Sequence, residues 1–118
     1  MPAAAAPWVV LATAPGNTQA RDVIVDSDGD SYVLGAFCNS SVTVGSTVIS
    51  GANVAGQAHC NISLSKISSE GSVLWARSMF GSGGQNWGDY VDVDSNGNVY
   101  VVGAFNGSRL ESGSIVLN

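Results

Sequence analysis

The sequence predicts an all-β fold made of short antiparallel strands in tandem units. Only 11% of the residues are charged, whereas the apolar share is 45% and there are 15 glycines. β-Branched and aromatic residues favour strands, and Gly, Ser and Asn favour turns. Long helices need more Leu, Glu, Lys and Arg than this chain carries. An internal repeat then divides the chain into units.

The repeat is direct. Residues 23–37 reappear as residues 91–105, at an offset of 68 residues, and 10 of the 15 positions are identical. Residues 45–49 match residues 113–117 at the same offset, and Trp8 matches Trp75 at an offset of 67. At this period, 118 residues hold about one and three-quarter repeats. Such periodicity is typical of repeat architectures.

Each copy begins with a predicted β-hairpin. Residues 21–26 form the first strand, and residues 31–37 form the return strand after the turn Ser-Asp-Gly-Asp. Residues 90–105 repeat the hairpin around Ser-Asn-Gly-Asn. We expect Gly29 and Gly97 to adopt positive φ, because such turns favour glycine there.

The first copy continues through a long connection at residues 39–59, with a small hairpin expected at 42–44 and 47–49. A strand at 61–67, a turn, and a strand at 72–79 that contains Trp75 complete the unit. Four antiparallel strands in up-and-down order are the pattern of a β-propeller blade.

These motifs resemble the SBBP-type β-propeller repeat. Residues 94–103 match the Asp-x-x-Gly-Asn-x-Tyr-Val-x-Gly hairpin of that family, and residues 26–35 match it nearly as well. Residues 66–71, followed by Trp75, match its lysine strand, glycine turn and tryptophan strand. Residues 61–65 depart from the pattern because they contain no aromatic residue. The resemblance implies tandem four-stranded antiparallel blades from Trp8 onward.

The resulting division of the chain is as follows: residues 1–7 are a flexible lead, 8–21 the last strand of a preceding blade, 22–80 a complete blade with a long 39–59 insertion, and 81–118 a partial second blade. Stacked repeats bury a core only against neighbours, and unpaired strand edges invite pairing. We therefore expect the partners to be other copies of this chain or further blades of a longer parent chain.

Charge excludes several partners. The net charge is −5, with four basic residues. Binding to nucleic acid requires several Lys and Arg on phosphates, which this chain lacks. No stretch approaches the ~20 apolar residues of a membrane span, so no membrane insertion is expected.

The cysteines and sequons favour export. A Cys38–Cys60 disulfide would stabilise the fold by about 3 kcal/mol in the loop-entropy model, and two free thiols are the alternative. Asn39, Asn61 and Asn106 each begin an N-glycosylation sequon. An extracellular or cell-surface location is therefore expected.

Sites for chemistry are few. Asp26, Asp28 and Asp30 offer oxygen ligands of the kind that calcium prefers, or simply cap a tight turn; both interpretations stay open. His59 stands beside Cys60 without the further ligands that zinc requires. No Gly-x-Ser-x-Gly or phosphate-binding loop occurs, so neither an enzyme nor a cofactor is expected.

Tryptophan supplies the best candidate ligand site. Trp8 and Trp75 occupy equivalent repeat positions, which predicts core packing for both. Trp87 lies in a predicted Gly-rich loop, and the expected ligand-binding residues are Trp87, Gln85, Asn86 and Asp89.

The sequence therefore predicts a non-catalytic, extracellular structural or interaction module of β-propeller repeats, within a larger protein or assembly. A carbohydrate-binding, lectin-like propeller that recognises glycans is the alternative. A third interpretation is a piece of a propeller enzyme whose active site lies in other blades, since fold does not fix function.

Overall fold

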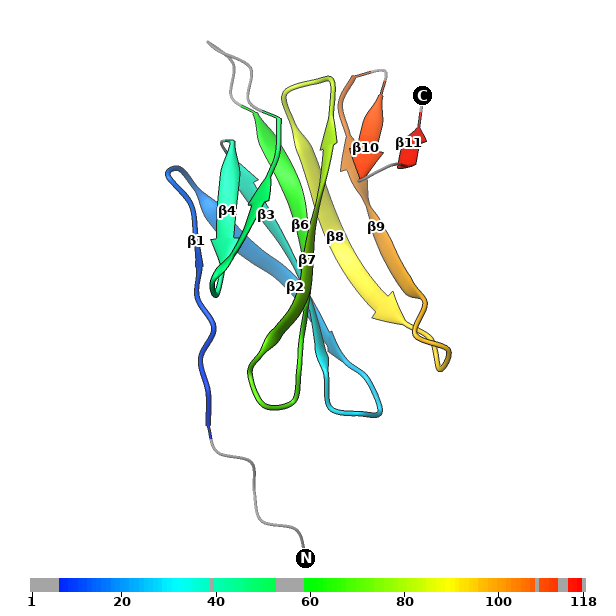
Figure 1. Ribbon diagram of the computed structural model, residues 1–118. Coiled ribbons are helices and arrows are strands. Elements are labelled where there is room, and N and C mark those ends of the chain that lie inside the picture. The colour runs from blue at the N-terminus through cyan, green and yellow to red at the C-terminus, as the bar shows by residue number, and fades with distance from the viewer. Residues whose placement is uncertain (1–6, 39, 53–58, 108, 113–114, 118) are drawn as a thin grey trace, which may run out of the picture.

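The computed structural model describes residues 7–38, 40–52, 59–107, 109–112 and 115–117 (Figure 1). This part of the chain is all-β, with strands in three separate sheets and no helix. All of the strand ladders are antiparallel. Within the described ranges the sheets close into neither a barrel nor a propeller ring.

The central sheet has six strands. Four of them are neighbours in the order in which the complete unit was predicted, and the small C-terminal hairpin extends the sheet beyond the last of these four. The strands are β2 (Thr18–Val25), β3 (Ser31–Cys38), β6 (Cys60–Ile67), β7 (Val73–Gly81), β10 (Leu110–Ser112) and β11 (Ile115–Leu117).

The second hairpin stacks on this sheet. Strands β8 (Asn86–Val93) and β9 (Val99–Phe105) pair only with each other among the described strands. The hydrophobic core between the hairpin and the sheet contains Tyr32, Leu34, Ile62, Leu64 and Val91, all of them buried. Burial of this apolar surface holds the two repeats together.

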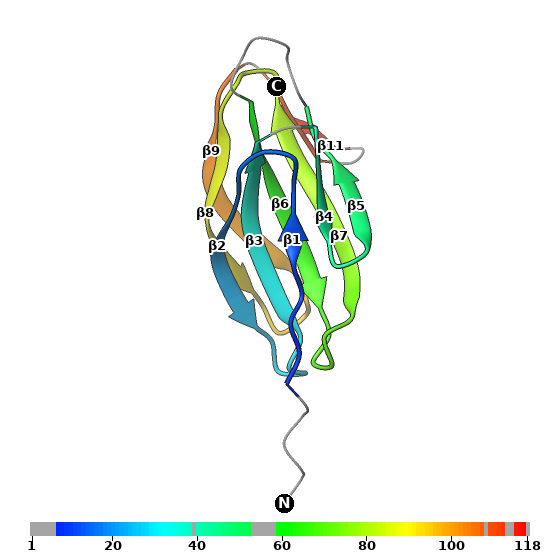
Figure 2. The same cartoon turned by 90° about the vertical axis from the view of Figure 1, so that its left-hand side faces the viewer.

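A smaller sheet covers the other side, as Figure 2 shows, with strand order β1 (Ala12–Thr13), β4 (Ser41–Val44) and β5 (Thr47–Ser50). Its register repeats that of the C-terminal hairpin. Thr13 pairs with Thr43, and Phe80 pairs with Glu111, 67 and 68 residues further on. In both places the small hairpin of one repeat pairs with the tryptophan-bearing segment of the preceding repeat.

Both predicted hairpin turns are confirmed. Gly29 has φ of 83° and Gly97 has φ of 81°. The carboxylate of Asp26 accepts the backbone N–H groups of Asp28 and Asp30 at 2.9 and 3.0 Å. Asp94 does the same in the second turn. These bonds explain why aspartate begins each turn.

Two boundaries differ from the prediction. The expected division between residues 8–21 and 22–80 falls inside β2, because that strand begins at Thr18. The expected Gly-rich loop around Trp87 is the start of strand β8. The predicted small hairpin within residues 39–59 is confirmed as β4 and β5.

Candidate functional site

The two repeats expose equivalent residues very differently. Tyr32 and Leu34 of β3 are 2% and 0% exposed, whereas Tyr100 and Val102, 68 residues later on β9, are 57% and 63% exposed. The difference arises because the β8–β9 hairpin packs on this face of β3, where Tyr32 and Leu34 share a core with Val91. In the described part of the chain, β9 pairs only with β8. We call Tyr100, Val102 and Ala104, which alternate along one side of the strand and are all exposed, the β9 face.

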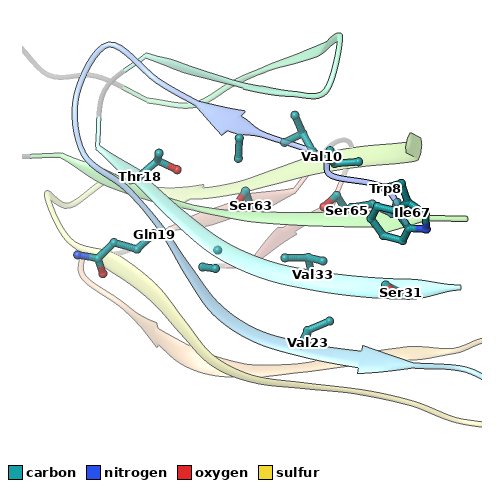
Figure 3. A pocket seen from close by; sticks show the side chains of 14 residues that line it. Trp8, Val10, Thr18, Gln19, Val23, Ser31, Val33, Ser63, Ser65 and Ile67 are labelled. Carbon is teal, nitrogen blue, oxygen red and sulfur yellow. The ribbon is translucent and has the colours of Figure 1, made fainter. Parts of the chain in front are cut away.

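A groove lies at the opposite end of the repeat array. It has a volume of about 410 Å³ and is lined by residues from the N-terminal segment and from β2, β3 and β6 (Figure 3). Val23 is 57% exposed there, although Val91, its equivalent in the second repeat, is buried. We call this feature the N-terminal groove. Its lining includes Trp8, Val10, Val23, Val33, Ser65 and Ile67.

A lysine joins the turn and the core of the first repeat. The ammonium group of Lys66 lies 3.3 Å from the carboxylate of Asp30 and 3.8 Å from that of Asp26. It also lies 5.1 Å from the centre of the Tyr32 ring. The hydrogen bond with Tyr32, followed by that with Asp30, raises the pKa of Lys66 despite the opposing effect of burial.

The same carboxylates are occupied by internal contacts. Burial alone would raise the pKa of Asp26, but hydrogen bonds from Asp30, Asp28 and Tyr32, together with the charge of Lys66, lower it overall. The described residues contain no group of three or more His, Cys, Asp or Glu arranged to hold a metal. The lysine beside Asp26 and Asp30 disfavours a calcium ion there, because two cations would repel each other.

The equivalent cluster of the second repeat has no lysine beside it. Asp94 accepts hydrogen bonds from the Asn98 amide at 2.8 Å and from the Tyr100 hydroxyl at 3.0 Å. The bonds with Asn98 and Tyr100 lower the pKa of Asp94, and the bond to Asp94 raises that of Tyr100. Among the described residues, no ion pair includes Asp94.

The predicted ligand residues lie around one pocket. Trp87, Gln85 and Asn86 line a cavity of about 290 Å³ together with Gln19 and Arg21. Trp87 is 40% exposed. Asp89 pairs with Arg21 at 3.5 Å, so this carboxylate sits beside the cavity without lining it.

Asn86 has a mainly structural environment. Its side chain is fully buried, and its amide donates to the carbonyl of Cys60 at 2.9 Å. Its oxygen accepts the backbone N–H of Asn106 at 3.4 Å. The side chain therefore joins β8 to β6 and to the end of β9, and only three of the four predicted ligand residues have exposed surface to offer.

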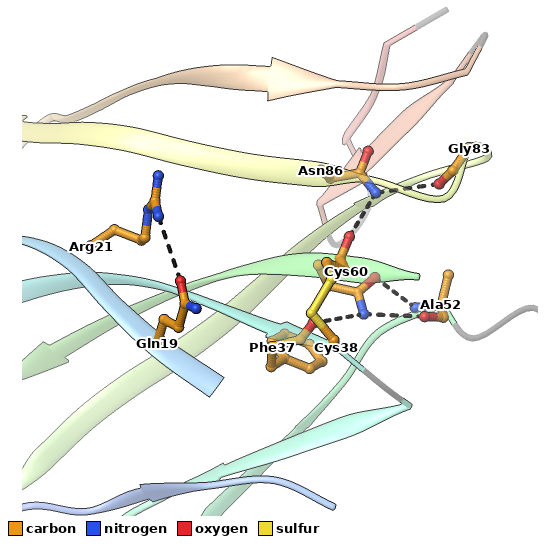
Figure 4. The surroundings of a disulfide bond; sticks show 9 residues. Gln19, Arg21, Phe37, Cys38, Ala52, Cys60, Gly83 and Asn86 are labelled. Atoms are coloured by element: carbon orange, nitrogen blue, oxygen red, sulfur yellow. Dashed lines mark hydrogen bonds between the residues drawn. A yellow bond between two sulfur atoms is a disulfide. The ribbon is translucent and has the colours of Figure 1, made fainter. Parts of the chain in front are cut away.

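The predicted disulfide is confirmed. Cys38 and Cys60 are bonded, and their Cα atoms lie 4.0 Å apart on directly opposite positions of β3 and β6. The bond closes the base of the segment that carries β4 and β5. Figure 4 shows this bond, and both cysteines line the same pocket as Trp87.

The three sequons differ in accessibility. Asn61 is fully buried, and its amide donates to the carbonyls of Ala52 and Phe37. The folded chain has no room for a glycan there, which corrects the expectation for this residue. Asn106 is exposed, and Asn39 lies outside the described residues.

The remaining singled-out residues are His59 and the tryptophans. His59 lies in the loop before β6 and is 3% exposed, and neither ring nitrogen has a hydrogen-bond partner among the described residues. Trp75 packs edge-on against Tyr32, with ring centres 6.1 Å apart, as predicted. Trp8 is 40% exposed, and its indole N–H donates to the Ser69 carbonyl. No described strand covers the exposed part of the Trp8 side chain.

The sequence did not reveal the Lys66 cluster or the N-terminal groove as sites. The available signal was that Tyr32 has an equivalent in Tyr100, 68 residues later, whereas Lys66 is the single lysine of the sequence. The described residues include no helix of the length and apolarity needed to cross a bilayer. No protein-family model, curated protein or solved structure matches this chain.

Proposed function

We propose that this chain is a non-catalytic, extracellular structural or interaction module of β-propeller-type repeats, which binds further repeat units at its two open faces. The observation that carries the proposal is the contrast between Tyr32 and Leu34, which are buried, and Tyr100 and Val102, which are exposed. Tyr100 and Val102 occupy positions that the fold buries in the first repeat, where the hairpin of the next repeat packs on Tyr32 and Leu34.

The opposite end supports the same proposal. Val23 and Val25 are 57% and 58% exposed, whereas their equivalents Val91 and Val93 pack on the core between the repeats. Large exposed apolar surfaces mark interaction sites in soluble proteins. One end therefore presents the face that receives a hairpin, and the other presents the face that a hairpin uses to dock.

The extracellular location rests on the disulfide. A bond between Cys38 and Cys60 is stable in oxidising compartments and is rare in the reducing cytosol. Asn106, which begins a sequon, is exposed, as the same route requires of a glycosylated asparagine.

Self-association provides the test. Sedimentation velocity over a range of concentrations is expected to show particles heavier than the 12.0 kDa chain. Val102→Asp places a charge on the β9 face, and Val23→Asp places one in the N-terminal groove. Each should shift the distribution toward the monomer, because burying an unpaired charge is costly.

Val48→Asp is the matched control, because Val48 is 64% exposed on β5 and lies outside both faces. It should leave the mass distribution unchanged. A wild-type chain that stays a monomer at every concentration contradicts the proposal, as does a Val48→Asp variant that dissociates as much as the other two.

A lectin-like module remains the second candidate, because Trp87 borders a pocket with Gln19, Arg21 and Gln85. Aromatic rings with polar neighbours suit sugar binding. Titration with neutral oligosaccharides should then change tryptophan fluorescence, and Trp87→Ala should abolish the saturable response. Trp8→Ala is the control, because Trp8 is equally exposed at 40% but lies outside this pocket. No saturable response in the wild type rejects this candidate.

A further inference from the structure

The pairing of β3 with β6 shows what a third strand contributes to a repeat. Lys66 lies opposite Tyr32, Leu64 opposite Leu34, and Ile62 opposite Ala36. Ile62 and Leu64 enter the hydrophobic core. Lys66 neutralises the turn carboxylates and covers the ring of Tyr32. One strand therefore supplies two apolar side chains and one cation at alternate positions.

Strand β9 carries the residues equivalent to those of β3, but no described strand lies beside it in the position that β6 takes beside β3. Tyr100, Val102 and Ala104 stand 68 residues after Tyr32, Leu34 and Ala36, and all three are exposed. An exposed edge of this kind presents unpaired N–H and C=O groups for strand addition. Tyr100, Val102 and Ala104 would then be cross-strand neighbours of side chains at alternate positions of the added strand, as Tyr32, Leu34 and Ala36 are in the first repeat.

The charge at the end of β9 fits one cation. In the first repeat Lys66 faces two carboxylates, those of Asp26 and Asp30. The second repeat has Asn98 in place of Asp30, so Asp94 is the carboxylate that remains. Its oxygen already holds the Tyr100 hydroxyl at 3.0 Å, next to the place that a lysine opposite Tyr100 would reach.

The neighbouring hairpin leaves this edge accessible. β10 pairs with β7 in the same way as β4 pairs with β1. The hairpin of β10 and β11 is therefore the equivalent of the hairpin of β4 and β5. In the first repeat, β4 and β5 coexist with β6. The equivalent arrangement in the second repeat therefore leaves space for a third strand beside β9.

We propose that the free edge of β9 binds the third strand of a further repeat unit, in antiparallel register, with its lysine opposite Tyr100 and against Asp94. The pattern recognised is apolar-x-apolar-x-Lys, and the apolar residues lie opposite Ala104 and Val102. This inference rests on the proposed function and specifies its partner at one of the two open faces.

The test uses a capped, fluorescently labelled peptide with the sequence of residues 61–67, Asn-Ile-Ser-Leu-Ser-Lys-Ile. Fluorescence anisotropy at low salt is expected to show saturable binding to the intact chain. A peptide with glutamine at the lysine position should bind about fivefold more weakly, in line with a partly exposed ion pair. A peptide of the same composition in shuffled order should not bind.

Variants of the chain locate the site. Asp94→Asn keeps an acceptor for the turn and should weaken binding of the lysine peptide, but not that of the glutamine peptide. Asp28→Asn removes the same charge from the turn of the first repeat and should have no effect. Val102→Asp should abolish binding, and amides of residues 99–105 should gain protection from hydrogen exchange when the lysine peptide is bound.

Several outcomes would overturn the strand site. These are no saturable binding, equal affinity for the lysine and glutamine peptides, and binding that survives Val102→Asp. A chain that self-associates in sedimentation but binds no peptide leaves the proposed function intact and rejects this inference alone. A chain that stays a monomer but binds the peptide at β9 supports this inference and rejects self-association.

Discussion

Leu34→Ala is expected to lower the free energy of unfolding by about 3 kcal/mol, the usual range for a buried leucine. Leu34 is fully buried in β3 at the contact between the two repeats. A Cβ on Gly88 of β8 would stand 2.8 Å from its side chain, which shows how closely the hairpin approaches. Removing the isobutyl group leaves a cavity at this contact.

Urea unfolding measures the effect, and the repeat provides an internal control. Val102 occupies the equivalent position of the second repeat but is 63% exposed. Val102→Ala should change stability by less than about 0.5 kcal/mol when the chain is monomeric. Hydrogen exchange of β8 and β9 should quicken in Leu34→Ala but not in Val102→Ala. Equal losses of stability in the two variants would mean that the hairpin does not depend on the contact at Leu34.

Local signals predicted the hairpins well because their chemistry is local. Asp26 and Asp94 each bind backbone N–H groups two and four residues later, and Gly29 and Gly97 supply the positive φ that the turn requires. These interactions depend only on the residues of the turn. The alternating apolar residues on either side then fix the two strands.

Contacts between repeats were harder to predict. Nothing local indicates that β4 pairs with β1, or that β10 pairs with β7, since both partners are distant in the sequence. The exposure of Trp8 follows from the same cause. Its sequence position is equivalent to that of Trp75, but only Trp75 has Tyr32 beside it.

The candidate sites show a similar division. The disulfide was predicted because Cys38 ends one expected strand and Cys60 precedes the next. The sequon at Asn61 suggested an accessible amide, yet the side chain is buried because it binds both backbone groups of Ala52. A sequence motif specifies neither burial nor bonding partners, which depend on the path of a connection far from the motif.

The main asymmetry of the chain is that β3 pairs on both sides, with β2 and β6, whereas its equivalent β9 pairs only with β8 among the described strands. In the first repeat, Lys66 and the apolar residues of β6 satisfy the turn carboxylates and the core face together. In the second repeat, Asp94 and the β9 face are present, but no described strand takes the place of β6. The exposed surface is therefore complementary to a segment whose chemistry the chain itself displays.

Replacing Cys38 and Cys60 together with serine is expected to lower the free energy of unfolding by about 3 kcal/mol. The bond spans a sequence separation of 22 residues, and opening it enlarges the set of unfolded conformations. The segment between the cysteines carries β4 and β5, whose pairing with β1 should become less protected from hydrogen exchange. Denaturant unfolding under oxidising conditions measures the loss.

Reduction provides the control for this variant. Dithiothreitol should destabilise the wild-type chain by a similar amount and leave the double-serine variant unaffected. The hairpin of β8 and β9 should keep its protection from hydrogen exchange in both cases. Asn106 stands at the position equivalent to Cys38, so the second repeat has no disulfide to lose. If reduction leaves the wild-type unfolding midpoint unchanged, the network of Asn61, Ala52 and Phe37 holds the base of the segment without the disulfide.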